Sequence, residues 1–246
     1  MIDYFKYYAL SALAVIISLT VHEFSHAFAA YKLGDPTARN FGRLTLNPIK
    51  HIDIFGALCM LFFHFGWAKP VPVNDRYFKH PRRDFALTSV AGPISNIILA
   101  ILFGFLYLLL NNSAAGVLSY GSEFVINLFG NVLTFVGLMH IINVGLAVFN
   151  LIPIPPLDGS RLIGLLLPER IYVKMLEYER YIYFVLLGWL FLGDRLVWFL
   201  RELPLIAENA FLYTAVGIFS LSEIVGYAMN FVSNGILELL ALLPFL

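Results

Sequence analysis

One stretch sets the fold class of this chain: YYALSALAVIISLTVHEFSHAFAAY, residues 7–31. Its 25 positions hold a single formally charged residue, Glu23. As a helix rising ~1.5 Å per residue it would be about 37 Å long, enough to cross the roughly 30 Å hydrocarbon core of a bilayer. A cleavable signal has a shorter apolar region, about 7–15 residues, followed by a small-residue cleavage site. The stretch is therefore predicted to be a permanent membrane span.

The rest of the chain has a similar composition. Of its 246 residues, 60% are hydrophobic and 13% are charged, with a mean hydropathy of +0.80. A soluble domain carries about 25% charged residues, so this chain has too few charges to cover a surface that faces water. Long apolar stretches follow at 85–110, 124–152, 181–200 and 205–246, the last long enough for two helices. We predict an all-α polytopic membrane protein with about six transmembrane helices.

The segment between the first two spans, residues 32–84, is different because it is rich in proline, asparagine and charge. It encloses a short apolar piece, 54–66, which is too short to span a bilayer and is predicted to be re-entrant or buried. The adjoining WAKPVPVN, residues 67–74, holds two prolines without N–H groups, which favours the edge of a small β segment over a sheet centre. Such an edge would offer the free backbone groups of Val71 and Val73, and a surface loop is the alternative.

The basic residues predict the orientation. Thirteen of the 16 Lys and Arg residues lie in 32–84 and 153–180, and none lies in 111–123. Basic loops remain cytoplasmic, so the N-terminus is expected outside and both basic segments inside. Lys plus Arg equals Asp plus Glu at 16 each, which gives no reason to expect nucleic acid as a partner. We divide the chain into a core, 1–180, and C-terminal transmembrane helices, 181–246.

The first span carries the pattern H-E-x-x-H in His22, Glu23 and His26. Charged and imidazole side chains are costly inside a membrane, so they are candidates for function. Histidines four residues apart share one face of a helix and can bind one metal ion, while Glu23 lies between them in projection, placed to act as a base. The alternative is a buried hydrogen-bond network between helices.

Two histidines leave a catalytic zinc ion short of a third protein ligand. Asp158 follows the proline-rich end of the third long stretch, where it is either a ligand or the N-cap of the next helix. His140 is the rival ligand, and it forms a polar stripe with Asn143 and Asn150 on one helix face. Spacing alone leaves these alternatives open. The other histidines are expected in loops or interfaces: His51, His64 and His80.

The second long stretch also contains polar and small residues, in GPISN at 92–96. Helix packing explains the small residues, and Asn96 is a candidate to line the path of a substrate.

HEFSH at 22–26 and FNLIPIPPLDG at 149–159 resemble the two signature motifs of the site-2 proteases, which are intramembrane zinc metalloproteases. The resemblance continues through FGRLTLNPIKHID, GWAKPVPVN and HPRRDFALTSVAGPISN, and it covers about residues 15–170. The chain is similar to the compact branch of the family, since no stretch here could be an inserted PDZ domain or an appended CBS pair.

The resemblance implies a site. His22, His26 and Asp158 would bind one Zn²⁺ per chain, with Asp158 completing the ligand set. Glu23 would be the catalytic base, and Asn150 would face the reacting carbonyl. The implied substrate is a transmembrane segment of a protein or peptide in the lipid bilayer.

The implied location is a prokaryotic cell membrane. His26 lies six residues before Lys32, which places the expected site toward the cytoplasmic side. Three rival functions are a metal-binding or transport protein, a membrane hydrolase acting on a non-peptide bond such as that of a lipid, and an inactive scaffold. Glu23 argues against the first, because a site that only binds zinc needs no base.

Overall fold

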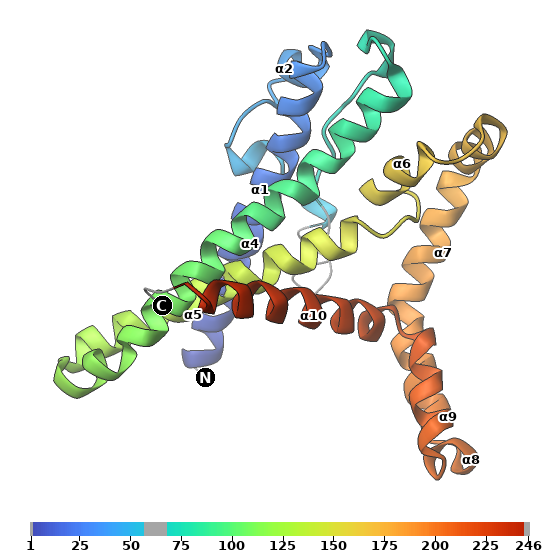
Figure 1. Ribbon diagram of the computed structural model, residues 1–246. Helices are drawn as coiled ribbons and strands as arrows, with labels where there is room; N and C mark the ends of the chain where they lie inside the picture. The colour runs from blue at the N-terminus through green and yellow to red at the C-terminus, as the bar shows by residue number, and fades with distance from the viewer. Residues whose placement is uncertain (1, 57–67, 244–246) are drawn as a thin grey trace.

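The computed structural model describes residues 2–56 and 68–243. Five long helices make up most of this part (Figure 1): α1 (Ile2–Lys32), α4 (Pro81–Tyr120), α5 (Glu123–Asn150), α7 (Glu169–Arg201) and α10 (Leu221–Ala241). The short helices are α2 (Thr37–Asn40), α6 (Asp158–Gly164), α8 (Pro204–Ala207) and α9 (Ala210–Ala215), with 3₁₀ turns η1 (Pro48–Lys50), η2 (Asp75–Tyr77) and η3 (Val216–Phe219). The described residues contain no strand, only an isolated antiparallel bridge between Ile52 and Ala68.

Four of these helices, α1, α4, α5 and α10, are long and apolar enough to cross a membrane. The two halves of α7, Glu169–Leu190 and Leu192–Arg201, meet at a 43° bend and together form a fifth candidate span. The all-α, multi-span architecture is confirmed, whereas the predicted count of about six spans is not confirmed by the described residues.

The difference in span count lies in residues 205–246. This stretch was expected to hold two spans, but its first part folds as the short elements α8, α9 and η3, and only α10 is long enough to cross. Pro204 begins α8, since proline is tolerated in the first turn of a helix. The Asn209 side chain then accepts a hydrogen bond from the backbone of Leu212, which starts another helix after one turn.

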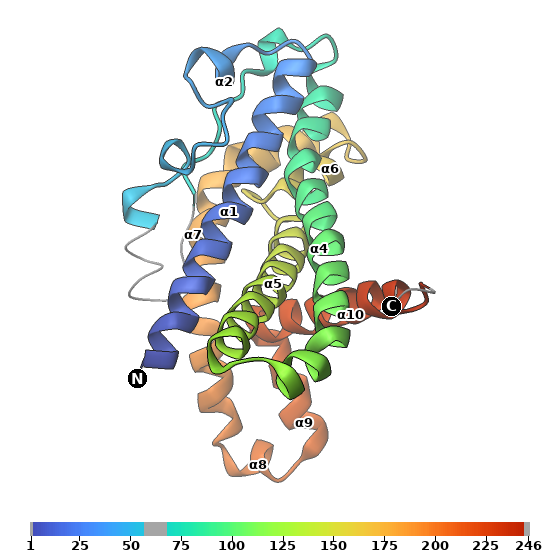
Figure 2. The same ribbon diagram turned by 90° about the vertical axis from the view of Figure 1, so that its left-hand side faces the viewer.

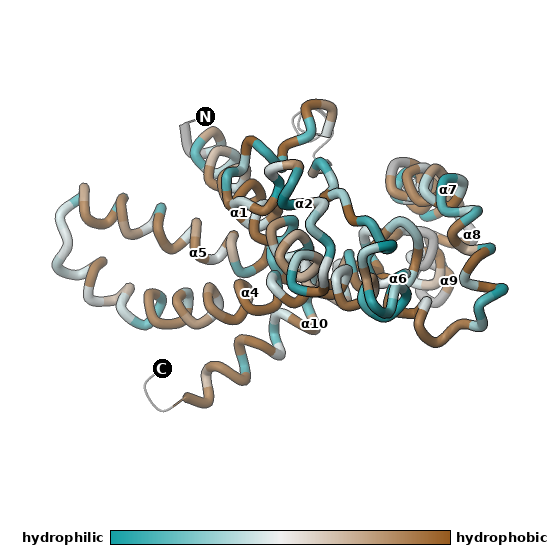
Figure 3. Tube along the Cα trace, turned by 90° about the horizontal axis from the view of Figure 1, so that it is seen from above, coloured by the Kyte–Doolittle hydropathy of each residue, from teal (hydrophilic) through white to brown (hydrophobic). Residues whose placement is uncertain are grey.

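Helices α1, α4 and α5 pack side by side and form the body of the molecule (Figures 1 and 2). Fully buried alanines lie along their contacts: Ala14, Ala27, Ala30 and Ala100. Small side chains let helix backbones approach closely, which is how transmembrane helices gain packing contacts in the absence of water. Seen from above, hydrophobic residues follow these helices and α10, while hydrophilic residues gather at α2 and around α6 (Figure 3).

The C-terminal helices are attached less extensively. Helix α10 crosses α5 and α4, and α7 meets the rest of the molecule chiefly through α10 and η3. A small apolar cluster of Leu157, Leu186 and Leu221 joins the start of α6 to α7 and α10. The division of the chain at residue 180 remains a prediction.

Candidate metal centre

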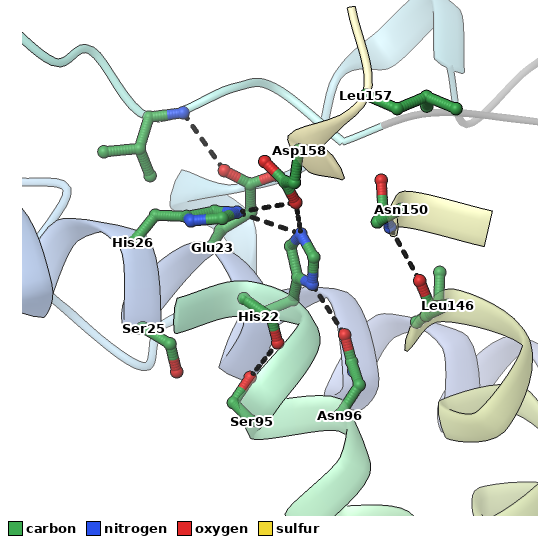
Figure 4. A network of polar contacts seen from close by, with 12 residues as sticks. His22, Glu23, Ser25, His26, Ser95, Asn96, Leu146, Asn150, Leu157 and Asp158 are labelled. Atoms are coloured by element: carbon green, nitrogen blue, oxygen red, sulfur yellow. Dashed lines mark hydrogen bonds and ion pairs between the residues drawn. The ribbon is translucent and has the colours of Figure 1, made fainter. Parts of the chain in front are cut away.

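Two nitrogen atoms and one oxygen atom, from two helices, converge at one point (Figure 4). His22 and His26 of α1 bring their Nε2 atoms to 3.0 Å from each other. The Oδ2 atom of Asp158, at the start of α6, lies 3.2 Å from Nε2 of His22 and 3.3 Å from Nε2 of His26. We call these three atoms the donor triangle. Among the described residues they form a group able to hold a metal ion.

The partners of the histidine rings identify which nitrogens carry hydrogen. Nδ1 of His22 lies 2.6 Å from the side-chain oxygen of Asn96, and Nδ1 of His26 lies 2.8 Å from the main-chain oxygen of Thr88. A carbonyl oxygen only accepts, so each Nδ1 donates and each Nε2 keeps its lone pair. Oδ2 of Asp158 is buried and has no hydrogen-bond donor among the described residues.

The donor triangle therefore brings three lone pairs together with no proton between them. Such an arrangement is repulsive unless a cation lies among the three atoms. Tetrahedral ligands at the usual Zn²⁺ distances of ~2.0–2.1 Å lie roughly 3.3 Å from one another, close to the observed separations. Two imidazoles and a carboxylate are also a ligand set that zinc prefers. The residues present fit a zinc ion.

The backbone around Asp158 explains how its carboxylate reaches the histidines. Helix α6 begins at Asp158, and Leu157 occupies the N-cap position without a side-chain capping bond, so Asp158 is not the N-cap. A Cβ at Gly159 would lie 2.2 Å from the main-chain oxygen of Leu151, so the tight turn requires glycine there. Arg82 of α4 donates to the main-chain oxygen of Gly164 and holds the far end of α6.

Helix α4 passes directly beneath the two histidines at Gly92. A Cβ at this position would lie 2.5 Å from Nε2 of His26 and 2.6 Å from Cε1 of His22. The sequence predicts helix packing for GPISN, or a place for Asn96 on the path of a substrate. In the structure Gly92 makes room for the imidazoles, and Asn96, one turn later, bonds to His22.

Glu23 lies beside the donor triangle (Figure 4), and its Oε2 accepts a hydrogen bond of 3.0 Å from the backbone N–H of Val71. The expected β edge at 67–74 is not seen in the described residues, and the Val71 N–H is bonded to Glu23, which corrects the prediction that it is free. Two further backbone hydrogen bonds hold this stretch in place. Lys69 N–H donates to the main-chain oxygen of His51 at 2.8 Å, and Asn74 N–H donates to Asp35 at 2.7 Å.

Residues 57–67, which include most of the predicted re-entrant piece and His64, lie outside the described residues. His140 is not part of the donor triangle. Its Nδ1 lies 2.8 Å from the main-chain oxygen of Ala100 and its Nε2 lies 2.9 Å from the hydroxyl of Ser233, so it joins α5 to α4 and α10. His51 bonds within its own loop, to the main-chain oxygen of Thr45.

The donor triangle and Glu23 face a cavity of about 1380 Å³. Apolar side chains from α5, α7 and α10 make up much of its wall: Leu146, Phe149, Leu186, Leu187, Leu190 and Met229. Asn150, at the end of α5, also lines it and donates its Nδ2 to the main-chain oxygen of Leu146. On the same wall Nη2 of Arg161 in α6 donates to both carboxylate oxygens of Glu179 in α7, at 2.7 and 2.8 Å. This volume exceeds the ~300–1,000 Å³ of ordinary small-molecule pockets.

Apolar spanning helices and a zinc-type donor set next to a glutamate define a membrane metalloprotease class. A model of peptidase family M50 matches residues 10–193, and the chain belongs to this family. It is thus a zinc metalloprotease and an integral membrane protein, its cofactor is Zn²⁺, and the resemblance to the site-2 proteases is confirmed.

The names of individual relatives agree with this family assignment. The chain is 44% identical over 203 residues to the "Putative zinc metalloprotease YwhC" of Bacillus subtilis. The matched residues make up 80% of this chain and 90% of that relative. Proteins named "Putative zinc metalloprotease Rip2" match at 32% over 149 residues in Mycolicibacterium smegmatis and at 35% over 150 residues in Mycobacterium tuberculosis. These matches cover 58% of this chain and 52% of each Rip2 protein, about half its length. No solved structure gives a significant match.

Proposed function

We propose that this protein hydrolyses peptide bonds within or next to the transmembrane segments of other membrane proteins. One observation carries the proposal: the donor triangle and Glu23 lie on the wall of a large apolar cavity bounded by candidate spanning helices. A soluble peptide has no need of such a wall, whereas a transmembrane segment would bury its apolar side chains against it.

The chain's residues take distinct roles in this proposal. His22, His26 and Asp158 would hold the zinc ion, which when bound supplies the Lewis acidity that activates water and polarises a carbonyl. Glu23 accepts the proton of the attacking water and later gives it to the leaving amine. The Val71 N–H holds one oxygen of Glu23 and thereby fixes the direction of the carboxylate. Asn150, on the cavity wall, would face the reacting carbonyl as a hydrogen-bond donor.

The substrate must present an extended backbone. The carbonyl groups of an intact transmembrane helix are hydrogen-bonded and screened, so they are closed to attack until the helix unwinds locally. Pro70, Val71 and Val73 line the cavity beside Glu23 in a stretch that is neither helix nor strand. An unwound substrate would run alongside this stretch, as extended peptides do in other recognition sites.

The site is proposed to lie toward the cytoplasm. The C-terminal end of α1, the N-terminal end of α4 and helix α6 lie at the same end of the molecule, and they carry basic residues that include Lys32, Arg82 and Arg161 (Figure 1). In a Cys59→Ser background, Tyr120→Cys at the opposite end should react with an impermeant maleimide only from outside the cell. Lys50→Cys should react only when the reagent reaches the cytoplasm, and the reverse pattern would overturn the orientation.

The test of the function is cleavage in reconstituted vesicles. Wild-type protein should cut transmembrane peptides that contain helix-breaking residues, with the cut site found by mass spectrometry inside the apolar segment. Glu23→Gln should keep its zinc but lose activity by ~10²–10⁴-fold, because the amide cannot accept the proton. The exposed Glu208→Gln is the matched control and should cut normally. Cleavage of lipid but not of peptide, or full activity in Glu23→Gln, would contradict the proposal.

A further inference from the structure

We infer that Asn143 and Ser18, which contribute no atom to the donor triangle, fix the tautomer of His22 by setting the direction of the Asn96 amide. They are positioning residues for the metal centre, and the inference rests on the zinc site proposed above. It concerns a buried polar chain that links α5, α4 and α1 and ends at the Nδ1 atom of His22.

The chain consists of five contacts, one of which is the Nδ2 group of Asn96 donating to the main-chain oxygen of Ser18 at 3.5 Å. The Nδ2 group of Asn143 donates to the main-chain oxygen of Met139 at 2.7 Å and to the hydroxyl oxygen of Ser18 at 2.8 Å. The Oδ1 atom of Asn143 accepts from Nδ2 of Asn96 at 2.8 Å. The Oδ1 atom of Asn96 lies 2.6 Å from Nδ1 of His22.

The direction of every bond follows from two main-chain oxygens, that of Met139 next to Asn143 and that of Ser18 next to Asn96. The main-chain oxygen of Met139 can only accept, so the NH₂ group of Asn143 must face it and the oxygen must face Asn96. That oxygen in turn attracts the NH₂ group of Asn96, which leaves the Asn96 oxygen facing the imidazole of His22. The imidazole must then carry its hydrogen on Nδ1, and its Nε2 lone pair faces the donor triangle.

Burial keeps this direction from reversing. Asn96, Asn143 and Ser18 are each 0% exposed, so water does not offer alternative partners. A reversed Asn143 would place its oxygen against the oxygen of Met139 and its NH₂ group against that of Asn96, which pairs acceptor with acceptor and donor with donor. A reversed Asn96 would turn its NH₂ group toward His22 and favour hydrogen on Nε2. The donor triangle would then lose one of its three lone pairs.

A second buried polar contact on α5 provides the matched control. His140 lies one turn before Asn143, is also buried, and joins α5 to α4 and α10 without touching Asn96 or His22. Replacing His140 by leucine removes a polar tie of the bundle but leaves the direction of the Asn96 amide unchanged.

The experiment measures the zinc dissociation constant of purified protein in detergent by competition with a chelator. Asn96→Leu should weaken binding by roughly 10–100-fold, the usual effect of removing the partner of a metal-bound histidine. Asn143→Leu should weaken it by a smaller factor, roughly 3–10-fold, since Asn143 acts one bond further away. His140→Leu should leave the constant unchanged. Asn143→Asp should bind zinc more tightly than Asn143→Leu, because a protonated aspartate can still donate to Met139 and accept from Asn96.

A double variant separates direction from general packing. In Asn96→Asp both side-chain oxygens accept, so no amide direction remains for Asn143 to set. Asn143→Leu should therefore cause no further loss of zinc affinity in the Asn96→Asp background, although it weakens binding in the native background. An equal loss in both backgrounds, an unchanged constant in Asn143→Leu, or an equal loss in His140→Leu would overturn the inference.

The same measurement distinguishes failure of the inference from failure of the site itself. If wild-type protein and His22→Ala bind zinc equally, the proposed ligand set is wrong. If wild-type protein binds zinc tightly, His22→Ala does not, and Asn143→Leu matches wild type, the ligand set stands and only the positioning role of Asn143 is overturned.

Discussion

Helices α1, α4 and α5, which lie next to the donor triangle, and the helices after residue 168 use polar side chains differently. In α1, α4 and α5, buried polar groups such as Asn96 and Asn143 bond to one another and end at Nδ1 of His22, the ring whose Nε2 belongs to the donor triangle. In α7 and α10, polar groups form clamps between two helices. Arg201 of α7 pairs with Glu223 of α10 at 2.5 and 3.0 Å, and Asp194 accepts from Ser220 and Ser222 at the start of α10.

This difference predicts that the two groups of helices have separate roles, one in zinc binding and the other in stability and substrate entry. A change to the polar residues of the first group that lead to His22, such as Asn96 and Asn143, alters atoms that orient a metal ligand, so it should change zinc affinity. A change in the second group alters how α7 and α10 stand beside the cavity, so it should change stability or substrate entry while zinc stays bound. Matched substitutions in the two groups test this division.

The largest difference in zinc binding is expected between substitutions at two aspartates. Asp158→Asn replaces a charged zinc ligand by a neutral amide and should weaken zinc binding by more than the ~10–100-fold typical of residues outside the ligand set. Asp194→Asn, which affects only the clamp to Ser220 and Ser222, should leave zinc binding unchanged. Metal analysis after dialysis measures both. Equal zinc content in the two variants would contradict the separate roles of the two groups of helices.

The next largest effect is a difference in cleavage rate between substitutions at two glycines in long helices. A Cβ at Gly92 would lie 2.5 Å from Nε2 of His26, so Gly92→Ala must displace the imidazoles. A displacement of this kind should lower the cleavage rate by about 10²-fold. Gly130→Ala on α5 is the control, because a Cβ there meets no atom within 4 Å. Similar cleavage rates in both variants would show that the close approach of α4 is unimportant.

A smaller effect is expected at the hydrogen bond to Glu23. Val71→Pro removes the N–H that donates to Oε2, and hydrogen bonds to charged groups contribute about 1.5–3 kcal/mol, so cleavage should fall by roughly 10–100-fold. Zinc content should stay at the wild-type level, since Val71 does not touch the donor triangle. Val73→Pro places the same residue two positions away and should have the weaker effect. The opposite ranking would assign substrate contact, and not Glu23 alignment, to this stretch.

The smallest effect is expected at the clamp between α7 and α10. Glu223→Gln weakens a partly exposed ion pair with Arg201 and should lower stability by about 1 kcal/mol or less. A thermal unfolding scan in detergent measures the shift, and zinc content should not change. Loss of zinc in this variant would mean that the two groups of helices are coupled more tightly than their contacts indicate.

The sequence predicted part of the site because part of it is local. The spacing of His22 and His26 places both rings on one helix face without reference to the rest of the chain. Asp158 lies 132 residues after His26, and spacing alone left it open as ligand or N-cap. The resemblance to the site-2 proteases favoured the ligand role, and α6 beginning at Asp158 excludes the N-cap.

Other features depended on packing between helices. Gly92 and Asn96 are four residues apart in an apolar helix, a spacing that puts both on the face toward α1, but no sequence pattern names their partner. The prolines at 70 and 72 predicted an extended chain, and the 69–73 stretch is neither helix nor strand. The bond from Val71 to Glu23 could not be predicted, because it depends on how the loop folds back. The count of about six spans is not confirmed by the described residues, because hydropathy does not show where 205–246 breaks into short helices.

Zinc K-edge absorption spectroscopy tests the central claim most directly, because it reports the atoms bound to the metal. In a Cys59→Ser background the protein should show only nitrogen and oxygen ligands, at about 2.0–2.1 Å. Asp158→Cys should add one sulfur at about 2.3 Å, while His140→Cys should leave the spectrum unchanged. A sulfur ligand in His140→Cys, or none in a zinc-loaded Asp158→Cys, would contradict a centre built from His22, His26 and Asp158.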